Sequence, residues 1–349
     1  MPEGIIEPMQ FSLITDPARW DELGGEWQAL AENTHTPVPF LEFWYLKTWW
    51  QSLGGGEWQR ETSRLQIITA RQDGVLIGAA PLFFTQKEDA PPALRFIGQV
   101  EVSDYLDFLC PRDHLQPFLA GLFDFIQNES RVLSPALDLA NFMDDSPSLP
   151  ILHALCEQRG IACSSEILQP SPYIPLKADW EAYLASISKK QRHEIRRKIR
   201  NAETRHETNW YILGNGQNSP KELQAFIDMM RNDPDKVSFL TPKMAVYMEQ
   251  LAASALEQNR LHLSFLTLDG QKSAAFLSFL GGNKLWVYNT AMEPAFTADS
   301  PGWVLLAKEI NWAIEQGMTE VDLMRGDEDY KYRFGGIDRH VISFKARLA

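Results

Sequence analysis

Several features that would classify a protein at once are scarce in this sequence. Its 349 residues contain three cysteines, Cys110, Cys156 and Cys163, and so sparse and odd a set argues against a disulfide framework. Paired Cys-x-x-Cys spacing is absent, so we expect no metal site. No apolar run approaches the 18 residues that cross a bilayer, and residues 1–10 lack an export signal. A cytoplasmic protein without a transmembrane segment is therefore expected.

Net positive charge is also lacking. The formal net charge is −13 and the isoelectric point is about 5.1, so the overall field does not favour nucleic acid. Hydrophobic residues make up 44% of the chain, which is ordinary globular usage. At roughly 100–200 residues per domain, the length favours two domains.

Strand and helix patterns alternate along the chain and predict a mixed α/β (α+β) fold. Prolines cluster near position 175, where we place the boundary between domains 1–175 and 176–349. The turns Asp73-Gly74 and Asp269-Gly270 align without gaps, with similar apolar patterns around them, which favours an internal duplication. The elements expected are helices at 16–34, 40–53, 114–128, 149–159, 180–205, 220–230, 242–258 and 302–316, and strands at 65–70, 75–85, 105–109, 136–139, 161–167, 261–268, 273–280, 284–292 and 320–324.

The sharpest local signal is Ser300-Pro301-Gly302, between a predicted strand and a predicted helix. Ser300 suits a helix N-cap, Pro301 suits the first helical position, and Gly302 allows close approach to the backbone. The N–H groups at a helix start attract anions such as phosphate. The alternative interpretation is an ordinary capped helix.

A dense cluster of acids, bases and tyrosines follows the last predicted strand, between Asp322 and Gly336. Charges at a strand end cost free energy unless they are paired or used. One interpretation is an ion network within the protein. The other is an acid–base set, in which a carboxylate accepts an amine proton and a tyrosine returns one to a leaving thiolate.

The stretch from Leu323 to Phe334 resembles a signature of the GNAT superfamily, in the branch of CelD-like proteins that is associated with cellulose and exopolysaccharide biosynthesis and related to FemAB peptidyltransferases. Three further segments are similar to that branch: the aromatic run 36–50, Ser103-Asp-Tyr-Leu-Asp107, and the basic stretch 188–197. The resemblance implies two tandem GNAT-like domains, each a mostly antiparallel sheet flanked by helices. It also implies acyl transfer, usually from acetyl-CoA or another acyl-CoA, to an amine acceptor.

The resemblance assigns candidate roles residue by residue. It implies a donor site in the C-terminal half and none in the N-terminal half, which would help to shape the acceptor site. It implies catalytic roles for Tyr330, Tyr332, Asp327, Glu328 and Lys331. The implied cofactor-binding residues are Asn289, Thr290, Ser300, Pro301, Gly302 and Trp303, and the implied substrate-binding residues are Asp104, Tyr105, Arg325 and Arg333.

The segment Lys189–Arg200 holds seven basic residues and one glutamate in an otherwise acidic chain. Its apolar positions leave the basic face of a helix open to solvent. One interpretation is a solvated face that pairs with the protein's own acids. The other is a binding site for an anionic ligand, such as an acidic acceptor, a phosphate of CoA, a tRNA end or a membrane surface.

Three functions remain open at this point. The first is an acyl-CoA N-acyltransferase acting on a small molecule or sugar amine, such as a cell-envelope or exopolysaccharide precursor. The second is an aminoacyl-tRNA-dependent peptidyltransferase, favoured by the basic segment and by the absence of the GNAT glycine pattern before Gly302, and disfavoured by the net acidity. The third is a non-catalytic accessory protein of polysaccharide biosynthesis.

Overall fold

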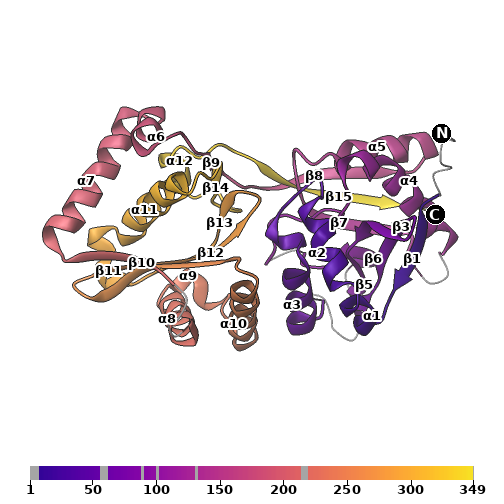
Figure 1. The fold of residues 1–349 in the computed structure, drawn as a ribbon, viewed down its shortest axis with the longest axis horizontal. Helices are drawn as coiled ribbons and strands as arrows, with labels where there is room; N and C mark the ends of the chain where they lie inside the picture. The colour runs from indigo at the N-terminus through magenta and orange to yellow at the C-terminus, as the bar shows by residue number, and fades with distance from the viewer. Residues whose placement is uncertain are drawn as a thin grey trace. The chain divides into compact units, whose positions relative to one another are not determined.

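The computed structural model describes residues 8–55, 62–87, 90–99, 102–129, 133–213 and 219–348. The chain forms two compact units, whose elements are labelled in Figure 1. The first comprises Met1–Gln169 together with His340–Ala349, and the second comprises Pro170–Arg339. From the sequence we placed the domain boundary after residue 175, six residues later than the end of the first unit at Gln169, and we assigned the C-terminal residues to the second domain. The structure differs because the last strand, β15, pairs with β7 of the first unit.

The first unit contains a three-stranded sheet, ordered β1-β3-β4, and a six-stranded sheet, ordered β2-β5-β6-β7-β15-β8. Its elements are β1 (Gln10–Ile14), α1 (Pro17–Asp21), α2 (Gly24–Glu32), η1 (Pro39–Leu41), α3 (Phe43–Leu53), β2 (Arg64–Leu65), β3 (Ile67–Gln72), β4 (Val75–Ala80), β5 (Leu82–Lys87), β6 (Ala90–Phe96), η3 (Arg112–His114), α4 (Leu115–Asn128), β7 (Ala136–Met143), α5 (Ser148–Arg159), β8 (Cys163–Pro170) and β15 (His340–Arg347).

The second unit has one six-stranded sheet, ordered β10-β11-β12-β13-β14-β9. Its elements are β9 (Tyr173–Pro175), α6 (Trp180–Ser186), α7 (Lys189–Arg205), β10 (Thr208–Ile212), α8 (Ser219–Arg231), α9 (Pro234–Val237), α10 (Pro242–Glu257), β11 (Leu261–Leu268), β12 (Gln271–Gly281), β13 (Lys284–Met292), η4 (Pro294–Asp299), α11 (Pro301–Glu315), β14 (Glu320–Asp322) and α12 (Asp329–Arg333).

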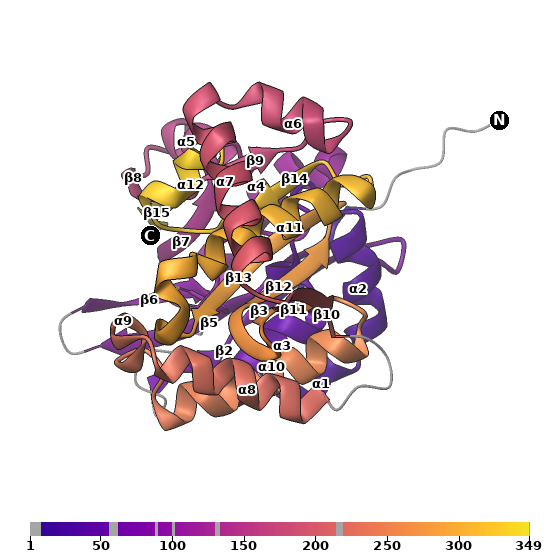
Figure 2. The same cartoon turned by 90° about the vertical axis from the view of Figure 1, so that its left-hand side faces the viewer.

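Helices cover both faces of this sheet. Figure 1 shows α7 and α11 on one face and α8 and α10 on the other, and α7 lies against α11 in Figure 2 as well. The core between α11 and the sheet is built from the apolar stripe of α11, with Val304, Leu306 and Ile310 almost fully buried. The predicted amphipathic helix is thus confirmed, with its apolar stripe against the sheet.

The two units share two structural features, a parallel strand pair and an Asp-Gly hairpin. Each contains a parallel strand pair joined by a helix, β6 with β7 through α4, and β13 with β14 through α11. Each also has a hairpin whose Asp-Gly turn takes a positive φ at both residues, 50° and 79° at Asp73-Gly74 and 51° and 75° at Asp269-Gly270. That backbone is the tight hairpin turn that Asp-Gly favours. The fold class expected from the sequence is therefore confirmed.

Several expected elements differ in detail. The strand expected at 75–85 is divided into β4 and β5 at Pro81, which has no N–H for a ladder. The helix expected at 180–205 is divided into α6 and α7, because Ser188 takes a non-helical ψ of 148° and its side chain caps a new start. Asp179 caps α6 as predicted.

In place of the expected strand at 105–109, Leu109 forms an isolated antiparallel bridge with Ala79. The buried carboxylate of Asp107 accepts hydrogen bonds from Ser148 (2.6 Å), Ser146 (2.5 Å) and Thr36 (3.2 Å). The Nε2 atom of His35 lies 3.1 Å from the same carboxylate. The stretch is therefore held by one backbone bridge and by the side-chain interactions of Asp107.

The His35–Asp107 pair makes the stability of the first unit depend on pH. Burial disfavours the charged form of each group, but the opposite charge and the hydrogen bonds outweigh it, so the pKa of His35 is raised and that of Asp107 is lowered. The histidine contribution is complete below its unfolded pKa of about 6.5 and is lost as the pH rises through its folded pKa. The aspartate contribution is lost only at strongly acidic pH.

We therefore expect Asp107→Asn to lower the free energy of unfolding by about 3 kcal/mol at pH 6. The loss should shrink as the pH rises through the raised pKa of His35, because the imidazole then becomes neutral in the folded state as well. Chemical denaturation across this range measures the difference. The matched variant Asp124→Asn removes an exposed ion pair with Arg159 and should change the stability by less than about 0.5 kcal/mol. An effect of Asp107→Asn that does not vary with pH would contradict the ion pair.

Candidate functional site

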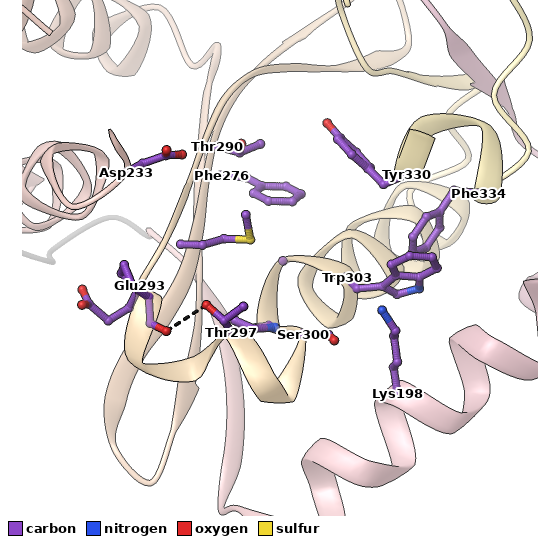
Figure 3. A pocket seen from close by; sticks show the side chains of 14 residues that line it. Lys198, Asp233, Phe276, Thr290, Glu293, Thr297, Ser300, Trp303, Tyr330 and Phe334 are labelled. Carbon is purple, nitrogen blue, oxygen red and sulfur yellow. Dashed lines mark hydrogen bonds between the residues drawn. The ribbon is translucent and has the colours of Figure 1, made fainter. Parts of the chain in front are cut away.

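A cavity of about 540 Å³ lies in the second unit, between the C-terminal half of β13, the start of α11 and α12 (Figure 3). Aromatic and aliphatic side chains dominate its wall, and a few polar groups interrupt them. The residues that line it are Lys198, Asp233, Phe276, Thr290, Met292, Glu293, Pro294, Thr297, Ser300, Pro301, Gly302, Trp303, Tyr330 and Phe334. A concave, mostly apolar site with few polar groups is typical of small-molecule binding.

The cavity exists because two parallel strands diverge. β13 pairs with β14 at only three positions, Lys284 to Trp286 against Glu320 to Asp322. From Val287 to Met292, β13 continues beyond the end of β14 while it still pairs with β12 on its other side. Within the described part of the chain, the edge of β13 that faces away from β12 has no strand partner over these residues, and such an edge can meet an extended ligand.

The first turn of α11 forms the floor beside this edge. Ser300 takes a left-handed conformation with a φ of 54°, and its side chain makes no capping hydrogen bond, so the N-cap interaction expected from the sequence is not made. Pro301 is the first helical residue, as predicted. A Cβ atom on Gly302 would lie 2.4 Å from the sulfur of Met292. Gly302 thus lets β13 pack closely against the start of α11.

Tyr330 extends from α12 into the cavity, and Figure 3 shows its hydroxyl group at the same end of the cavity as Thr290. Burial, together with the negative charge of Glu328, raises the pKa of Tyr330. The phenol is therefore protonated at neutral pH and can donate a proton. Among the predicted catalytic residues, Tyr330 is the one that lines this cavity.

The basic helix α7 reaches the cavity through Lys198, whose ammonium lies 3.7 Å from the centre of the Trp303 ring. Burial, outweighing the nearby carboxylate of Glu194, lowers the pKa of Lys198. At its end the helix pairs Arg205 with Asp299 at 2.6 Å, and His206 adds a second contact at 3.3 Å. The acid just before α11 is thereby neutralised and does not repel an anion at this helix start.

Other basic residues of α7 pair with nearby acids. Arg196 pairs with Glu181, and Arg197 pairs with Glu194 at 2.7 Å. Four more have no carboxylate partner within the described part of the chain: Lys189, Lys190, Arg192 and Arg200. Pairing with the protein's own acids, one of the two interpretations from the sequence, therefore applies to some cations of α7. The four cations without a carboxylate partner leave positive charge that could attract an anion.

The opposite side of the cavity is acidic. Asp233 and Glu293 both line it, and Asn232 donates a hydrogen bond of 2.9 Å to Glu293. The cavity thus has a basic side at α7 and an acidic side between α8 and α9. A molecule that carries a positive charge is favoured at the second side, and one that carries a negative charge is favoured at the first.

Sequence reasoning missed Lys236 on the short helix α9. Its ammonium donates to the carbonyl and the hydroxyl of Thr290 and to the side-chain oxygen of Asn289, the last at 3.3 Å. Burial lowers the pKa of Lys236, and Asp233 and Glu328 oppose that shift. The two predicted cofactor-binding residues on β13 are therefore held by Lys236. No motif marks this lysine, which lies in a connection between two predicted helices.

Lys331 points away from the cavity into the loop before α12. Its buried ammonium donates to the carbonyls of Met324 (2.9 Å), Arg325 (2.8 Å) and Gly326 (3.2 Å). It also pairs with Glu328 at 2.9 Å, while the Glu328 side chain itself is 57% exposed. Lys331 thus anchors the loop between β14 and α12, and Asp327 and Glu328 are exposed on that loop.

Tyr332 and Arg333 lie on the other side of α12, where they line a second cavity of about 370 Å³. The hydroxyl of Tyr332 donates to Asp338 at 2.8 Å; burial, reinforced by this hydrogen bond, raises its pKa to about 12. Arg333 pairs with Asp329. Tyr330 therefore lines the first cavity, whereas Tyr332 and Arg333 of the same short helix line the second.

The remaining predicted substrate-binding residues are distributed differently. Arg325 is partly buried in the loop that Lys331 anchors. Asp104 and Tyr105 belong to the first unit, where Tyr105 is fully buried and its ring contacts that of Phe40. The neighbouring Ser103 is also buried, and its carbonyl accepts from Asn141. This segment is part of the packed interior of the first unit.

Two further properties of the described residues bear on function. No group of three or more histidine, cysteine or acidic side chains among them is placed to hold a metal ion. No helix in this part of the chain has the length and apolar character needed to cross a membrane.

Comparison with known proteins agrees with this geometry. Residues 189–332 match the family model of the acetyltransferase (GNAT) domain. The fold is similar to that of FemX, at 14% identity, with 96% of each chain covered and a TM-score of 0.68. It is also similar to a conserved protein of unknown function from Bacteroides thetaiotaomicron, at 11% identity, 97% and 99% coverage and a TM-score of 0.60. No curated protein matches the sequence.

The resemblance stated from the sequence is therefore confirmed. Residues 189–332 carry a GNAT acetyltransferase domain, which is the domain of an acyltransferase, and the fold of the chain is similar to that of FemX. The matched segment includes α7, β13, α11 and most of α12, which are the elements that surround the first cavity.

The anchoring role of Lys331 can be tested by stability. We expect Lys331→Met to lower the free energy of unfolding by about 2 to 4 kcal/mol, because it leaves three loop carbonyls without a donor. The matched variant Lys308→Met removes a lysine whose ion pair with Glu203 is solvent-accessible, and it should cost less than about 1 kcal/mol. Urea unfolding measures the free energy of unfolding of both variants. A loss in Lys331→Met as small as that in Lys308→Met would contradict the anchoring role.

Proposed function

We propose that this protein transfers an acyl group from acetyl-CoA or another acyl-CoA to the amine of an acceptor, in the first cavity of the second unit. The observation that carries the proposal is the divergence of β13 from β14, with Tyr330 facing the gap. A small molecule or amino sugar, such as a cell-envelope or exopolysaccharide precursor, is the acceptor class that we infer. A cytoplasmic location is part of the proposal.

The residues present fit such a donor. The open edge of β13 offers backbone groups to the amides of a pantetheine arm, and Phe276, Met292 and Phe334 offer apolar contact to its methylenes. The start of α11, beside Lys198, suits a negatively charged end. We further propose that the first unit binds no donor, because its corresponding connection, residues 110–114, contains no glycine.

A bound thioester would supply a carbonyl carbon that an amine can attack. Asp233 and Glu293 attract a protonated amine to their side of the cavity, and a carboxylate there can accept its proton. As the new C–N bond forms and the C–S bond breaks, Tyr330 donates its proton to the departing sulfur. The phenolate that this leaves takes a proton back from solvent, because the pKa of Tyr330 is raised well above neutral pH.

An aminoacyl ester of tRNA is the alternative donor. It is favoured by η4, a 3-10 helix that occupies Pro294–Asp299 where GNAT domains usually have a glycine-rich phosphate loop. The unpaired cations of α7 would also suit a nucleic acid end. Direct binding measurements separate the two donors.

We expect acetyl-CoA and desulfo-CoA to bind with micromolar affinity in titration calorimetry at moderate salt. Gly302→Glu should abolish this binding, because it places a bulky negative charge at the start of α11. Gly25→Glu is the control, since Gly25 is exposed on α2 with nothing within 4 Å of its Cβ position. The absence of binding at millimolar ligand would reject the acyl-CoA donor and favour aminoacyl-tRNA or a non-catalytic role.

We expect Tyr330→Phe to lower kcat by a factor of about 10² to 10⁴ and to leave the affinity for the donor nearly unchanged. Steady-state kinetics with the best amine acceptor, combined with donor titration, make the distinction. Tyr211→Phe provides the control, because Tyr211 also donates a hydrogen bond, to Glu222 at 2.9 Å, but does not line the cavity. A variant Tyr330→Phe with full activity would exclude Tyr330 as the acid.

A further inference from the structure

The second cavity, of about 370 Å³, lies on the side of α12 opposite Tyr330. It is bounded by β9, the turn between α6 and α7, and the segment that follows α12. The residues that line it are Ile174, Pro175, Lys177, Tyr183, Ser186, Ile187, Ser188, Gln191, Tyr332, Arg333, Gly335 and Ile337. Two of these side chains are positively charged, and none of the described residues that line it is acidic. The first cavity has one cation and two acids, so the two differ in charge.

Two acids bind residues that line the second cavity. Asp338 accepts the hydrogen bond of Tyr332, and Asp329 pairs with Arg333 and offsets its charge. Asp179 caps the start of α6 by accepting from Ala182 at 2.8 Å. Lys177, in contrast, is exposed and has no carboxylate partner in the described part of the chain. Lys177 therefore contributes a positive charge to the wall that no paired acid offsets, while the whole protein carries a net charge of −13.

Further positive charge comes from the start of α7. The first turn of this 17-residue helix lines the cavity with Ser188 and Gln191. Three cations of the same turn have no carboxylate partner among the described residues: Lys189, Lys190 and Arg192. The hydroxyls of the lining residues Ser186 and Tyr332 already donate, to the carbonyl of Tyr183 at 2.7 Å and to Asp338 at 2.8 Å. The unpaired cation Lys177 and the start of α7, next to an apolar wall, form an arrangement that suits an oxyanion.

The shape of this cavity is built into the backbone. Gly335 takes a φ of 84°, and a Cβ atom there would lie 2.6 Å from Ile187. Tyr183 donates to the carbonyl of Phe334 at 2.8 Å, which joins the end of α6 to the segment after α12. These contacts hold the two sides of the cavity together without filling it.

We propose that the second cavity binds an oxyanion, a phosphate or a carboxylate, carried by a substrate of this protein. Lys177 provides the charge at the wall, the unpaired cations at the start of α7 add to it, and Ile174 and Ile337 contact the apolar or sugar portion next to the oxyanion. The site stands independently of acyl transfer in the first cavity, because it is defined by its own residues and its own ligand chemistry.

Direct titration with inorganic phosphate and with malonate tests the site. We expect saturable binding of at least one of them, observed by calorimetry at low ionic strength. Lys177→Ala should weaken it by at least about tenfold, the usual result of losing a charge-assisted hydrogen bond. Arg200→Ala is the matched control, an exposed cation at the other end of α7 that does not line the cavity. It should leave the affinity within about twofold.

A second pair of variants blocks the cavity without any change of charge. Ile337→Trp introduces a larger side chain at a lining residue that is 50% exposed, and it should abolish binding. Ile167→Trp, at a residue of β8 that is 66% exposed, is the control and should have no effect. Thermal melting monitored by circular dichroism shows whether each variant is folded.

The outcomes separate this proposal from the proposed function. If Arg200→Ala and Lys177→Ala weaken phosphate or malonate binding equally, the anion is attracted by the charge of α7 in general and the proposed site is wrong. The absence of saturable binding would also overturn the proposal. Weakening by Lys198→Ala alone would move the anion to the first cavity. Acetyl-CoA distinguishes the source: unchanged donor affinity in Lys177→Ala assigns the oxyanion to the acceptor, and weakened affinity assigns it to the donor. Phosphate binding with no acetyl-CoA binding would retain this site and reject the acyl-CoA donor.

Discussion

The second unit depends on the short parallel pairing between β13 and β14. Three paired positions are enough to fix the direction of both strands, and the crossover through α11 connects them. Beyond these positions the strands separate, which exposes one edge of β13 and leaves room for the side chains of α11 and α12.

The positively charged side chains around this gap have two different roles. The acidic chain concentrates cations on α7 and uses several of them internally, as in the pairing of Arg205 with Asp299. That pairing removes the repulsion that an acid before α11 would exert on an anion. Lys236 has a different role, because its buried ammonium holds Thr290 and Asn289 on the part of β13 that extends beyond β14. A lysine can bind backbone and side-chain oxygens together, since its ammonium has three donors.

The cluster after β14 shows how chemistry and structure share one short segment. Helix α12 spans five residues, yet Tyr330 faces one cavity, Tyr332 and Arg333 face another, and Lys331 is buried beneath the loop. Successive helical residues differ in direction by about 100°, so neighbours in sequence must separate in space. The resemblance implied catalytic roles for Tyr330, Tyr332 and Lys331 and a substrate-binding role for Arg333, because sequence similarity does not show which cavity each side chain faces.

The sequence by itself determined the class of fold, the tandem organisation and most of the long elements, since apolar periodicity and turn residues such as Asp269-Gly270 act locally. It also indicated α11 as the helix behind the site. Only the tertiary structure decided that β15 completes the sheet of the first unit, that Asp107 is consumed by a buried network, and that Lys331 anchors a loop while Tyr330 faces a cavity. These outcomes depend on partners distant in sequence, and no local pattern encodes which oxygen or carboxylate a side chain will meet.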